Sequence, residues 1–381
     1  MIIDKLKYEY KDVMIVPDTY TNIKSRNEVN PYHFTDNDDW YLPIFTAPMS
    51  CVVDADNFEH FNKNHILSIL PTTVSLSFRL EQFTKGQWTA FSMAEVSEYL
   101  IYNYDFLDSI NKDITLHICI DCANGHMTKL FRICKELKSQ CEQHGLTIEI
   151  MTGNIANPDV LIYYFEAGID YIRCGIGGGS GCTTSSNTGV HYPMASLISE
   201  CRKEVQELMK TGQYKNKVKI IADGGIRNYD DAVKALALGA DYVMIGGLFT
   251  QCLESASSIY TYNLFDREYS EILSLTSEEF IKMSEEERYS FLHDKSDIFY
   301  HEVYGMSTKR AQKERGYENL KTSEGTQHFV KVNYTLQQWV DNMDSYLRSA
   351  MSYTDCGCLD EFTTGNINLI VSPTTQSVIN K

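Results

Sequence analysis

Positive charge is scarce in this chain of 381 residues. It contains 34 lysines and arginines against 51 aspartates and glutamates, which gives a formal net charge of −17. Proteins that bind nucleic acid need clustered basic residues to displace counterions, and anionic membrane surfaces attract basic patches for the same electrostatic reason. We therefore expect no nucleic acid and no membrane as partners, and expect any phosphate to be bound locally by backbone N–H groups.

Long apolar runs are missing as well. No segment approaches the roughly 18 apolar residues of a membrane-spanning helix, and residues 1–10 lack the apolar stretch of a secretory signal. The 11 cysteines are odd in number and irregularly spaced, so they do not indicate a disulfide framework. These absences predict a soluble protein in a reducing, cytoplasmic setting.

Short apolar segments rich in β-branched and aromatic residues recur along the chain, separated by segments of helical period. Eight of them are predicted to be strands, at residues 43–47, 65–70, 88–93, 116–121, 148–153, 171–175, 218–222 and 242–246. Eight strands that mostly alternate with helices favour an α/β fold of the closed (β/α)₈ type, the TIM barrel. An open doubly wound sheet is the alternative.

The barrel is expected to form a single domain over residues 1–362. A charged, helix-prone segment at about 254–300 breaks the pattern after the last strand and is predicted to be an inserted helical lid. Within it, Thr276-Ser277-Glu278-Glu279 has the spacing of an N-terminal capping box. Residues 363–381 are polar without a clear period and are expected to form a C-terminal arm.

The most informative motif begins at Arg173 and reads RCGIGGGSGCTT. Its glycines permit tight turns and a close approach of backbone N–H groups to an anion. Cys182 lies on this loop after a predicted strand, where nearby N–H dipoles can activate a thiol as a nucleophile. From the residues alone, a small buried side chain without a catalytic role is an equally good interpretation.

Two more polar segments end the last two predicted strands, Asp223-Gly224-Gly225 and Gly246-Gly247. The corresponding loops of TIM barrels often bind phosphate, because the carboxyl ends of the strands meet at one face. Asp223 can accept hydrogen bonds from sugar hydroxyls. The alternative is that these glycines only turn the chain.

These motifs, in the order in which they occur along the chain, resemble those of the IMP dehydrogenase/GMP reductase family. The similarity also includes Ala47-Pro48-Met49, Asp121-Cys122-Ala123-Asn124-Gly125, Gly153-Asn154, residues 10–13, 24–29, 235–247 and 347–353, and Tyr304-Gly305-Met306-Ser307. The family is a (β/α)₈ barrel, usually a homotetramer, whose cysteine forms a covalent thioimidate at C2 of a purine nucleotide. The resemblance implies this role for Cys182.

The resemblance also assigns binding residues. It implies that the 5′-phosphate is held by Ser180, Gly225, Gly246 and Gly247, the ribose by Asp223, and the base by Tyr304, Met306 and Ser307. It implies contacts with the cofactor from Asp121, Asn124, Lys321 and Gly325. Backbone carbonyls of Gly177, Gly179 and Cys182 are the implied ligands of a monovalent cation such as K⁺.

Three features favour the reductase branch, which uses NADPH to convert GMP to IMP and ammonia. Thr188-Gly189-Val190-His191-Tyr192-Pro193 follows the cysteine loop, as in reductases, and no regulatory modules separate the second and third strands. Ser323-Glu324-Gly325 has Glu where dehydrogenases have Gln. Because loss of ammonia requires proton transfer, Glu324 is assigned as acid/base and Thr184 as its partner.

Three positions depart from the reductase pattern. The segment Val74-Ser75-Leu76-Ser77-Phe78-Arg79 lacks the lysine and histidines of the family, Lys321 replaces an arginine, and Phe91-Ser92-Met93 replaces a glycine-containing turn. These positions contact the dinucleotide or the base in the family. NADH therefore stays open beside NADPH, as do dGMP or a modified guanine nucleotide beside GMP. An IMP dehydrogenase that oxidises IMP with NAD, or a nucleotide-binding protein without turnover, are the alternative functions.

Overall fold

The structure is a computed structural model. It describes residues 6–34, 39–179, 184–214, 218–263, 267–272, 275–293, 298–305, 308–314, 322 and 326–371. Within these ranges, no helix has both the length and the apolar surface needed to cross a membrane. The ten cysteines that fall in them are free thiols.

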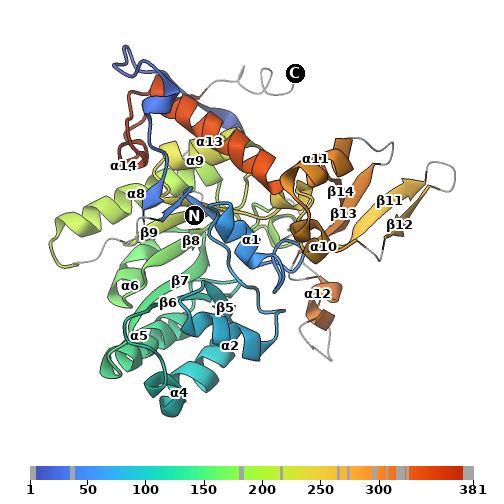
Figure 1. The fold of residues 1–381 in the computed structure, drawn as a ribbon. Coiled ribbons are helices and arrows are strands. Elements are labelled where there is room, and N and C mark those ends of the chain that lie inside the picture. Colours follow the sequence, from blue (N-terminus) through green and yellow to red (C-terminus); the bar gives the residue numbers. More distant parts are fainter. Residues whose placement is uncertain are drawn as a thin grey trace.

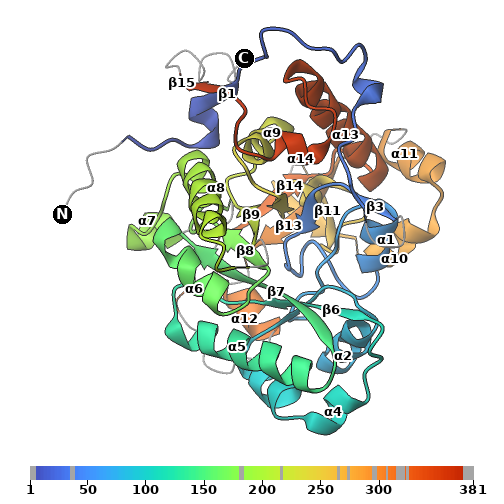
Figure 2. The same ribbon diagram turned by 90° about the vertical axis from the view of Figure 1, so that its left-hand side faces the viewer.

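Seven strands form one curved, parallel sheet at the centre of the molecule (Figures 1 and 2). The strands are β4 (Ile44–Thr46), β5 (Thr89–Phe91), β6 (Thr115–Ile120), β7 (Thr147–Ile155), β8 (Tyr171–Cys174), β9 (Lys219–Asp223) and β10 (Tyr242–Ile245). Their order is β4-β10-β9-β8-β7-β6-β5, so the first strand of the sheet lies beside the last. Each overlaps a strand predicted from the sequence.

The segment between β4 and β5 fills the eighth strand position. Leu67 pairs with β4 and Leu70 pairs with β5, each as an isolated parallel bridge. Backbone hydrogen bonds run from Thr46 N to Leu67 O (2.9 Å) and from Ala90 N to Leu70 O (2.8 Å). The sheet therefore closes into the predicted (β/α)₈ barrel, although the strand predicted over 65–70 is reduced to two bridges.

Helices cover the outside of the barrel (Figure 2). They are α1 (Phe58–Lys63), α2 (Leu76–Thr84), α3 (Met93–Glu95), α4 (Tyr104–Asp108), α5 (Thr128–Gln143), α6 (Leu161–Glu166), α7 (Thr184–Thr188), α8 (Met194–Lys210), α9 (Tyr229–Ala237), α13 (Leu336–Tyr353) and α14 (Leu359–Phe362). The start of α13 shows why such a helix begins where it does. Thr335 Oγ1 accepts from Gln338 N (3.2 Å) while Gln338 Oε1 accepts from Thr335 N (3.0 Å), which satisfies two otherwise unpaired N–H groups.

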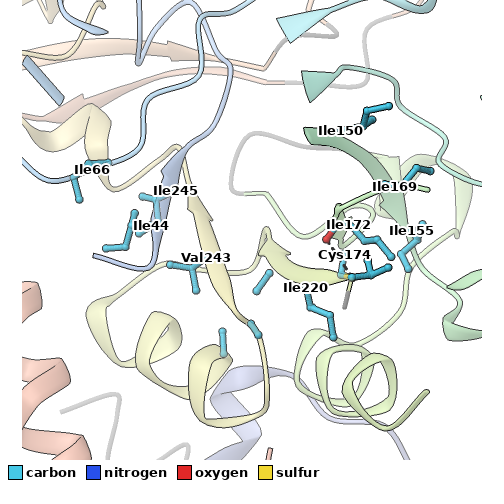
Figure 3. Packing of buried hydrophobic residues seen from close by; sticks show 14 of the residues in the cluster. Ile44, Ile66, Ile150, Ile155, Ile169, Ile172, Cys174, Ile220, Val243 and Ile245 are labelled. Carbon is cyan, nitrogen blue, oxygen red and sulfur yellow. Dashed lines mark hydrogen bonds between the residues drawn. The ribbon is translucent and has the colours of Figure 1, made fainter. Parts of the chain in front are cut away.

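Strand residues alternate between the barrel interior and the layer beneath the helices. Tyr171 of β8 and Ile221 of β9 belong to the interior cluster, whereas Ile172 belongs to the outer one. Figure 3 shows Ile172 and other residues of the outer cluster packed between strands and helices. Arg173 and Asp223 are the next inward positions after Tyr171 and Ile221. The two-residue period of a strand thus places both charges inside the mouth at the carboxyl ends.

A second, antiparallel sheet lies to one side of the barrel (Figure 1) and has the order β12-β11-β13-β14. This insert comprises β11 (Ile259–Asn263), β12 (Glu268–Glu271), α10 (Ser277–Lys282), α11 (Glu285–His293), β13 (Phe299–Tyr304), α12 (Lys309–Glu314) and β14 (Gln327–Lys331). The predicted capping box is confirmed, since Thr276 and Glu279 bond reciprocally. The segment predicted as a helical lid contains the two helices α10 and α11 but also strands, because Ile259 and Phe299 pack with the apolar residues of those helices.

Four short strands form two further sheets of two strands each, one of which links the two ends of the chain. β1 (Val13–Ile15) pairs antiparallel with β15 (Leu369–Val371), and β2 (His33–Phe34) pairs with β3 (Trp40–Tyr41). The arm predicted from residue 363 begins where α14 ends, at Phe362. Part of this arm is thus a strand, because its apolar triplet at β15 finds a partner in β1.

Candidate active site at the carboxyl ends of the strands

A buried guanidinium lies at the centre of the barrel mouth. Arg173 Nε donates to Asp223 Oδ2 (2.9 Å), and its Nη1 donates to Asp121 Oδ1 (3.0 Å). Burial alone would lower the pKa of Arg173, but the carboxylates raise it well above its ordinary value. The structure therefore brings together Asp121 and Asp223, predicted to bind cofactor and ribose. Arg173 itself was not predicted as a site residue. The signal that could have indicated it is a charged residue within an otherwise apolar strand.

Asn154 holds Asp223 from a second side. Its Nδ2 donates to Asp223 Oδ2 (2.7 Å) and to Gly175 O (2.8 Å). Asn154 and Arg173 bind the same carboxylate oxygen, so Oδ1 of Asp223 accepts no hydrogen bond from the described residues. A carboxylate fixed through one oxygen can accept hydroxyl groups with the other.

Two glycine-rich segments meet beside this carboxylate. Gly175 has φ +134°, and a Cβ there would lie 2.1 Å from Asp223 O. Gly224, with φ +108°, packs against Gly178, and Gly225 N donates to Gly178 O (2.8 Å). A side chain at Gly175 would meet both a steric clash and an unfavourable φ, and one at Gly224 would meet an unfavourable φ and a tight contact with Gly178. The N–H of Gly225, predicted to bind phosphate, joins the two loops here.

Gly246 and Gly247, the other described glycines predicted to bind phosphate, directly follow β10. A Cβ on Gly246 would lie 3.0 Å from Met49 Sδ, so the loop after β4 packs closely against it. Gly247 O accepts from Thr250 Oγ1 (2.8 Å). Since β9 and β10 are parallel neighbours, these glycines lie at the same end of the barrel as Asp223.

The loop after β6 carries the two described residues predicted to bind cofactor. Asp121 is bound to Arg173, whereas Asn124 is exposed and its Oδ1 accepts from His126 N (3.0 Å). Between them, Cys122 Sγ donates to Gly153 O (2.9 Å), and burial raises the pKa of this thiol. Asn124 is therefore the polar residue of this loop whose side chain is exposed for a ligand.

Tyr304, predicted to contact the base, joins the insert to the barrel mouth. It ends β13 and is 5% exposed. Its hydroxyl accepts from Ser50 Oγ (3.4 Å), its carbonyl accepts from Cys51 Sγ (3.6 Å), and Arg310 lies 4.6 Å from the centre of its ring. These contacts anchor the chain immediately before Met306 and Ser307.

Glu302 is a hub that the sequence reasoning missed. It is buried and accepts hydrogen bonds from Tyr260 Oη (3.1 Å), from the Arg310 guanidinium and from the Gln327 amide. Arg310 belongs to α12 and Gln327 to β14, so Glu302 joins the two ends of the segment that contains Glu324. An acidic residue between aromatic and apolar neighbours in Phe299–Tyr304 was the available signal.

A cavity of about 560 Å³ opens beside Tyr304, between the loops that follow the first two strand positions. It is lined by Ser50, Val53, Asp54, Ala55, Asp56, Thr73, Val74, Ser75, Phe78 and Tyr304. Its charged lining residues are Asp54 and Asp56. Burial raises the pKa of Asp56, and the neighbouring Asp54 raises it further.

Arg79 does not replace the lysine that this region lacks. Its guanidinium donates to Val74 O (2.8 Å), Ala90 O (2.8 Å) and Glu95 Oε1 (2.5 Å). Arg79 thus ties α2 to β5 and α3 and is buried away from the cavity.

Thr184, the predicted partner of the acid/base, begins α7 and is half-buried. The next residue, Ser185, donates from Oγ to Gly177 O (3.2 Å), which ties α7 to the glycine-rich loop. The carbonyl oxygen of Gly177, which was predicted to bind the cation, therefore already accepts one hydrogen bond. In the part of the chain that the structure describes, no group of three or more His, Cys, Asp or Glu could hold a metal ion.

The remaining predicted site residues lie outside the described residues. They are Ser180, Cys182, Met306, Ser307, Lys321, Glu324 and Gly325. In the chain, Gly179 precedes Ser180, Thr184 follows the segment that contains Cys182, and Gly305 precedes Met306.

Comparison with known proteins agrees with this geometry. The IMP dehydrogenase / GMP reductase domain matches residues 7–378. GMP reductase 2 of Bos taurus is 30% identical over 280 residues, which cover 72% of this chain and 76% of that protein. GMP reductase of Buchnera aphidicola subsp. Schizaphis graminum is 31% identical over 271 residues (66% and 71%), and that of Shewanella pealeana is 32% identical over 268 residues (67% and 72%).

Proposed function

Because the chain belongs to the IMP dehydrogenase/GMP reductase family, we propose that it catalyses the NADPH-dependent reductive deamination of GMP, or a close guanine nucleotide such as dGMP, to IMP and ammonia. The observation that carries the proposal is the Asp223 carboxylate, fixed by Arg173 and Asn154 between two glycine-rich loops. Relatives named GMP reductase support the reductase over the dehydrogenase.

The mouth suits a nucleoside monophosphate. Asp223 Oδ1 is the acceptor for the ribose hydroxyls. Gly225, Gly246 and Gly247, together with Ser180, form the proposed phosphate site, since glycine lets the backbone approach an anion closely. Tyr304 leads into the residues proposed to bind the base.

The chemistry needs a nucleophile, a proton donor and a hydride. Cys182 forms a bond to C2 of the purine, and the C2 amino group leaves as ammonia with a proton relayed by Glu324 and Thr184. The reduced nicotinamide, when bound, supplies the hydride to C2, and cleavage of the carbon–sulfur bond then releases IMP and the thiolate. Asp121 and Asn124, with Lys321 and Gly325, are the proposed contacts to the dinucleotide.

The cofactor choice needs a direct test in this chain. Among its described lining residues, the cavity beside Tyr304 has the carboxylates Asp54 and Asp56 and no basic side chain. A 2′-phosphate is usually held by arginine, whereas a carboxylate suits a free ribose diol. NADH is therefore the second reductant to assay. The proposal also includes a K⁺ ion, bound by the backbone carbonyls of Gly177, Gly179 and Cys182. The proposed assembly is a homotetramer.

One assay tests the reaction. The protein is incubated with GMP or dGMP and with NADPH or NADH, with and without K⁺, while loss of cofactor absorbance and release of ammonia are followed. Equal amounts of oxidised cofactor and ammonia support the proposal. Oxidation of IMP by NAD without any reduction of GMP establishes the dehydrogenase instead, and nucleotide binding with neither reaction establishes a protein without turnover.

A further inference from the structure

His191 lies between the amino-terminal segment and the glycine-rich loop. Its Nδ1 is 2.8 Å from the carbonyl oxygen of Ile176, and its Nε2 is 2.6 Å from Oε1 of Glu9. The other carboxylate oxygen of Glu9 accepts from Met194 N (3.0 Å), the first residue of α8. One histidine and one glutamate therefore connect three segments of the chain.

Both ring nitrogens of His191 face oxygen atoms that can only accept. A peptide carbonyl has no proton to donate, and neither has an ionised carboxylate. A neutral imidazole carries one N–H and can satisfy one of the two contacts, whereas the imidazolium carries two and satisfies both. The geometry around Ile176 and Glu9 thus selects the charged ring.

The surroundings of His191 agree with this charge. Burial lowers the pKa of the ring, but the hydrogen bond and the charge of Glu9 outweigh it, so the pKa is raised. On the neighbouring segments, Lys7 and Glu200 pair with each other beside Tyr192, and α7 contains no charged residue. The carboxylate of Glu9 is accordingly the charge that faces the ring.

We propose that His191 is a positioning residue, which as an imidazolium paired with Glu9 holds the Ile176 carbonyl and thereby the glycine-rich backbone that leads to Cys182. Gly175 and Gly177, on either side of Ile176, have φ of +134° and +78°. Such residues leave the backbone free to adopt many conformations, so a side-chain anchor between them restricts it. The inference rests on the proposed function only in taking Cys182 as the nucleophile.

The charged His191 ring is the form that makes both contacts, and this sets the direction in which turnover depends on pH. Because the pKa of folded His191 is raised, the contact is fully present below the ordinary value of 6.5 and is lost as pH rises through the raised value. Turnover should therefore fall on the alkaline side. Ionisation of a cysteine thiol alone would make turnover rise there.

The test compares kcat and KM across pH in His191→Gln, Glu9→Gln and the double variant. In His191→Gln, kcat should fall about tenfold with little change in KM, because a displaced loop weakens attack more than binding, and the alkaline fall should disappear. In Glu9→Gln, the alkaline fall should move to lower pH. The double variant should be no worse than the worse single variant, because the two residues act as one unit.

His144→Gln is the matched control. His144 Nδ1 is 2.7 Å from Asp108 Oδ1, a similar pair that involves the carboxyl end of α5 rather than the glycine-rich loop. This variant should keep the wild-type kcat and pH profile. Equal losses in His144→Gln and His191→Gln would show a general effect of removing a histidine pair and would overturn the proposal.

Two measurements need no turnover and separate this inference from the proposed function. An NMR titration of the His191 ring should give a pKa above 6.5 that decreases in Glu9→Gln. Hydrogen exchange at the amides of Gly177 to Gly179 should become faster in both single variants. A ring pKa at or below its ordinary value, or unchanged exchange in His191→Gln, overturns the inference even if GMP is reduced. If no nucleotide turns over, the same two results still decide it.

Discussion

The barrel mouth and the insert hold their charged groups in different ways. In the mouth, one guanidinium, that of Arg173, bridges two carboxylates that come from the ends of two other parallel strands. In the insert, buried carboxylates are the hubs. Glu302 binds side chains from β11, α12 and β14. Glu254, just before β11, binds Arg288 of α11 (3.0 Å) and the backbone N of Leu336 at the start of α13 (2.8 Å), and so holds the insert from outside.

The difference reflects how each region is positioned. Parallel strands closed into a barrel share one end, so the residues that follow them lie close together because of the fold itself. The insert leaves the barrel after β10, and no closed sheet sets its place. Its position depends on buried ion pairs, which cost several kcal/mol when one partner is removed. Substitutions in the mouth should therefore alter chemistry and local charge, and those at the insert hubs should alter placement.

The largest effect is expected in the mouth, from Cys182→Ala. Turnover of GMP should fall by several orders of magnitude, because removing a nucleophile leaves only binding and positioning. GMP should still bind, as calorimetry can show. Cys122→Ala is the control in the same mouth, since that thiol donates to Gly153 O and burial raises its pKa. Similar losses in both variants would contradict the assignment.

Glu324→Gln should separate the two halves of the reaction. Ammonia release from GMP should be abolished, because the amide cannot give up a proton in the same way. Hydride transfer between IMP and NADP should survive in part, since it needs Cys182 but no ammonia. Measuring both halves in one variant decides the point. Wild-type ammonia release would remove Glu324 as the acid/base, and equal loss of both halves in a folded protein would indicate a role in loop or cofactor geometry.

Arg173→Met should destabilise the barrel mouth most. It leaves the half-buried Asp121 and Asp223 without their cation, and the cost should approach the roughly 3–5 kcal/mol of breaking a fully buried pair. Urea unfolding measures the loss. Arg310→Met is the counterpart in the insert, where the arginine side chain is 39% exposed, and the loss of stability should be smaller. The reverse order would show that the insert, not the mouth, depends more on its cation.

Glu254→Gln should loosen the insert at a cost below the roughly 3–5 kcal/mol of a fully broken buried pair, because Arg288 would lose its buried partner and keep only the more exposed Glu285. Hydrogen exchange in α11 should become faster while the barrel strands stay protected. Lys282→Gln is the control in the same insert, since its pair with Glu278 is solvent-exposed. No difference between the two variants would mean that Glu254 does not position the insert.

The smallest effect is expected from pH acting on His301 of β13. This side chain is fully buried, its Nδ1 is 2.9 Å from Thr250 O, and burial lowers the pKa of its ring to about 4. Because the unfolded ring binds a proton more readily, stability should decrease as pH falls from about 6.5 towards 4, by about 1 kcal/mol at pH about 5.5. His301→Asn should flatten that part of the stability profile. His191, in the mouth, should show the opposite dependence, so the two histidines separate the two regions.

The sequence was sufficient for the barrel because its signals are local. β-branched runs such as those around Ile221 and Val243 have the length of strands, and the polar or glycine residues that follow them mark the carboxyl ends. The insert was only partly predictable. Its capping box at Thr276 is a local signal and was confirmed, whereas β13 pairs with β11 and β14 across tens of positions.

For the site, the sequence by itself determined which residue types gather at one end of the strands, including Asp121 and Asp223, because parallel strands in a barrel must end together. Only the tertiary structure decided their pairing. It placed Arg173 between the two carboxylates, and it brought Arg310 and Gln327 within hydrogen-bonding distance of Glu302. Such contacts depend on the distance and direction of side chains from separate elements, which no local pattern in the sequence encodes.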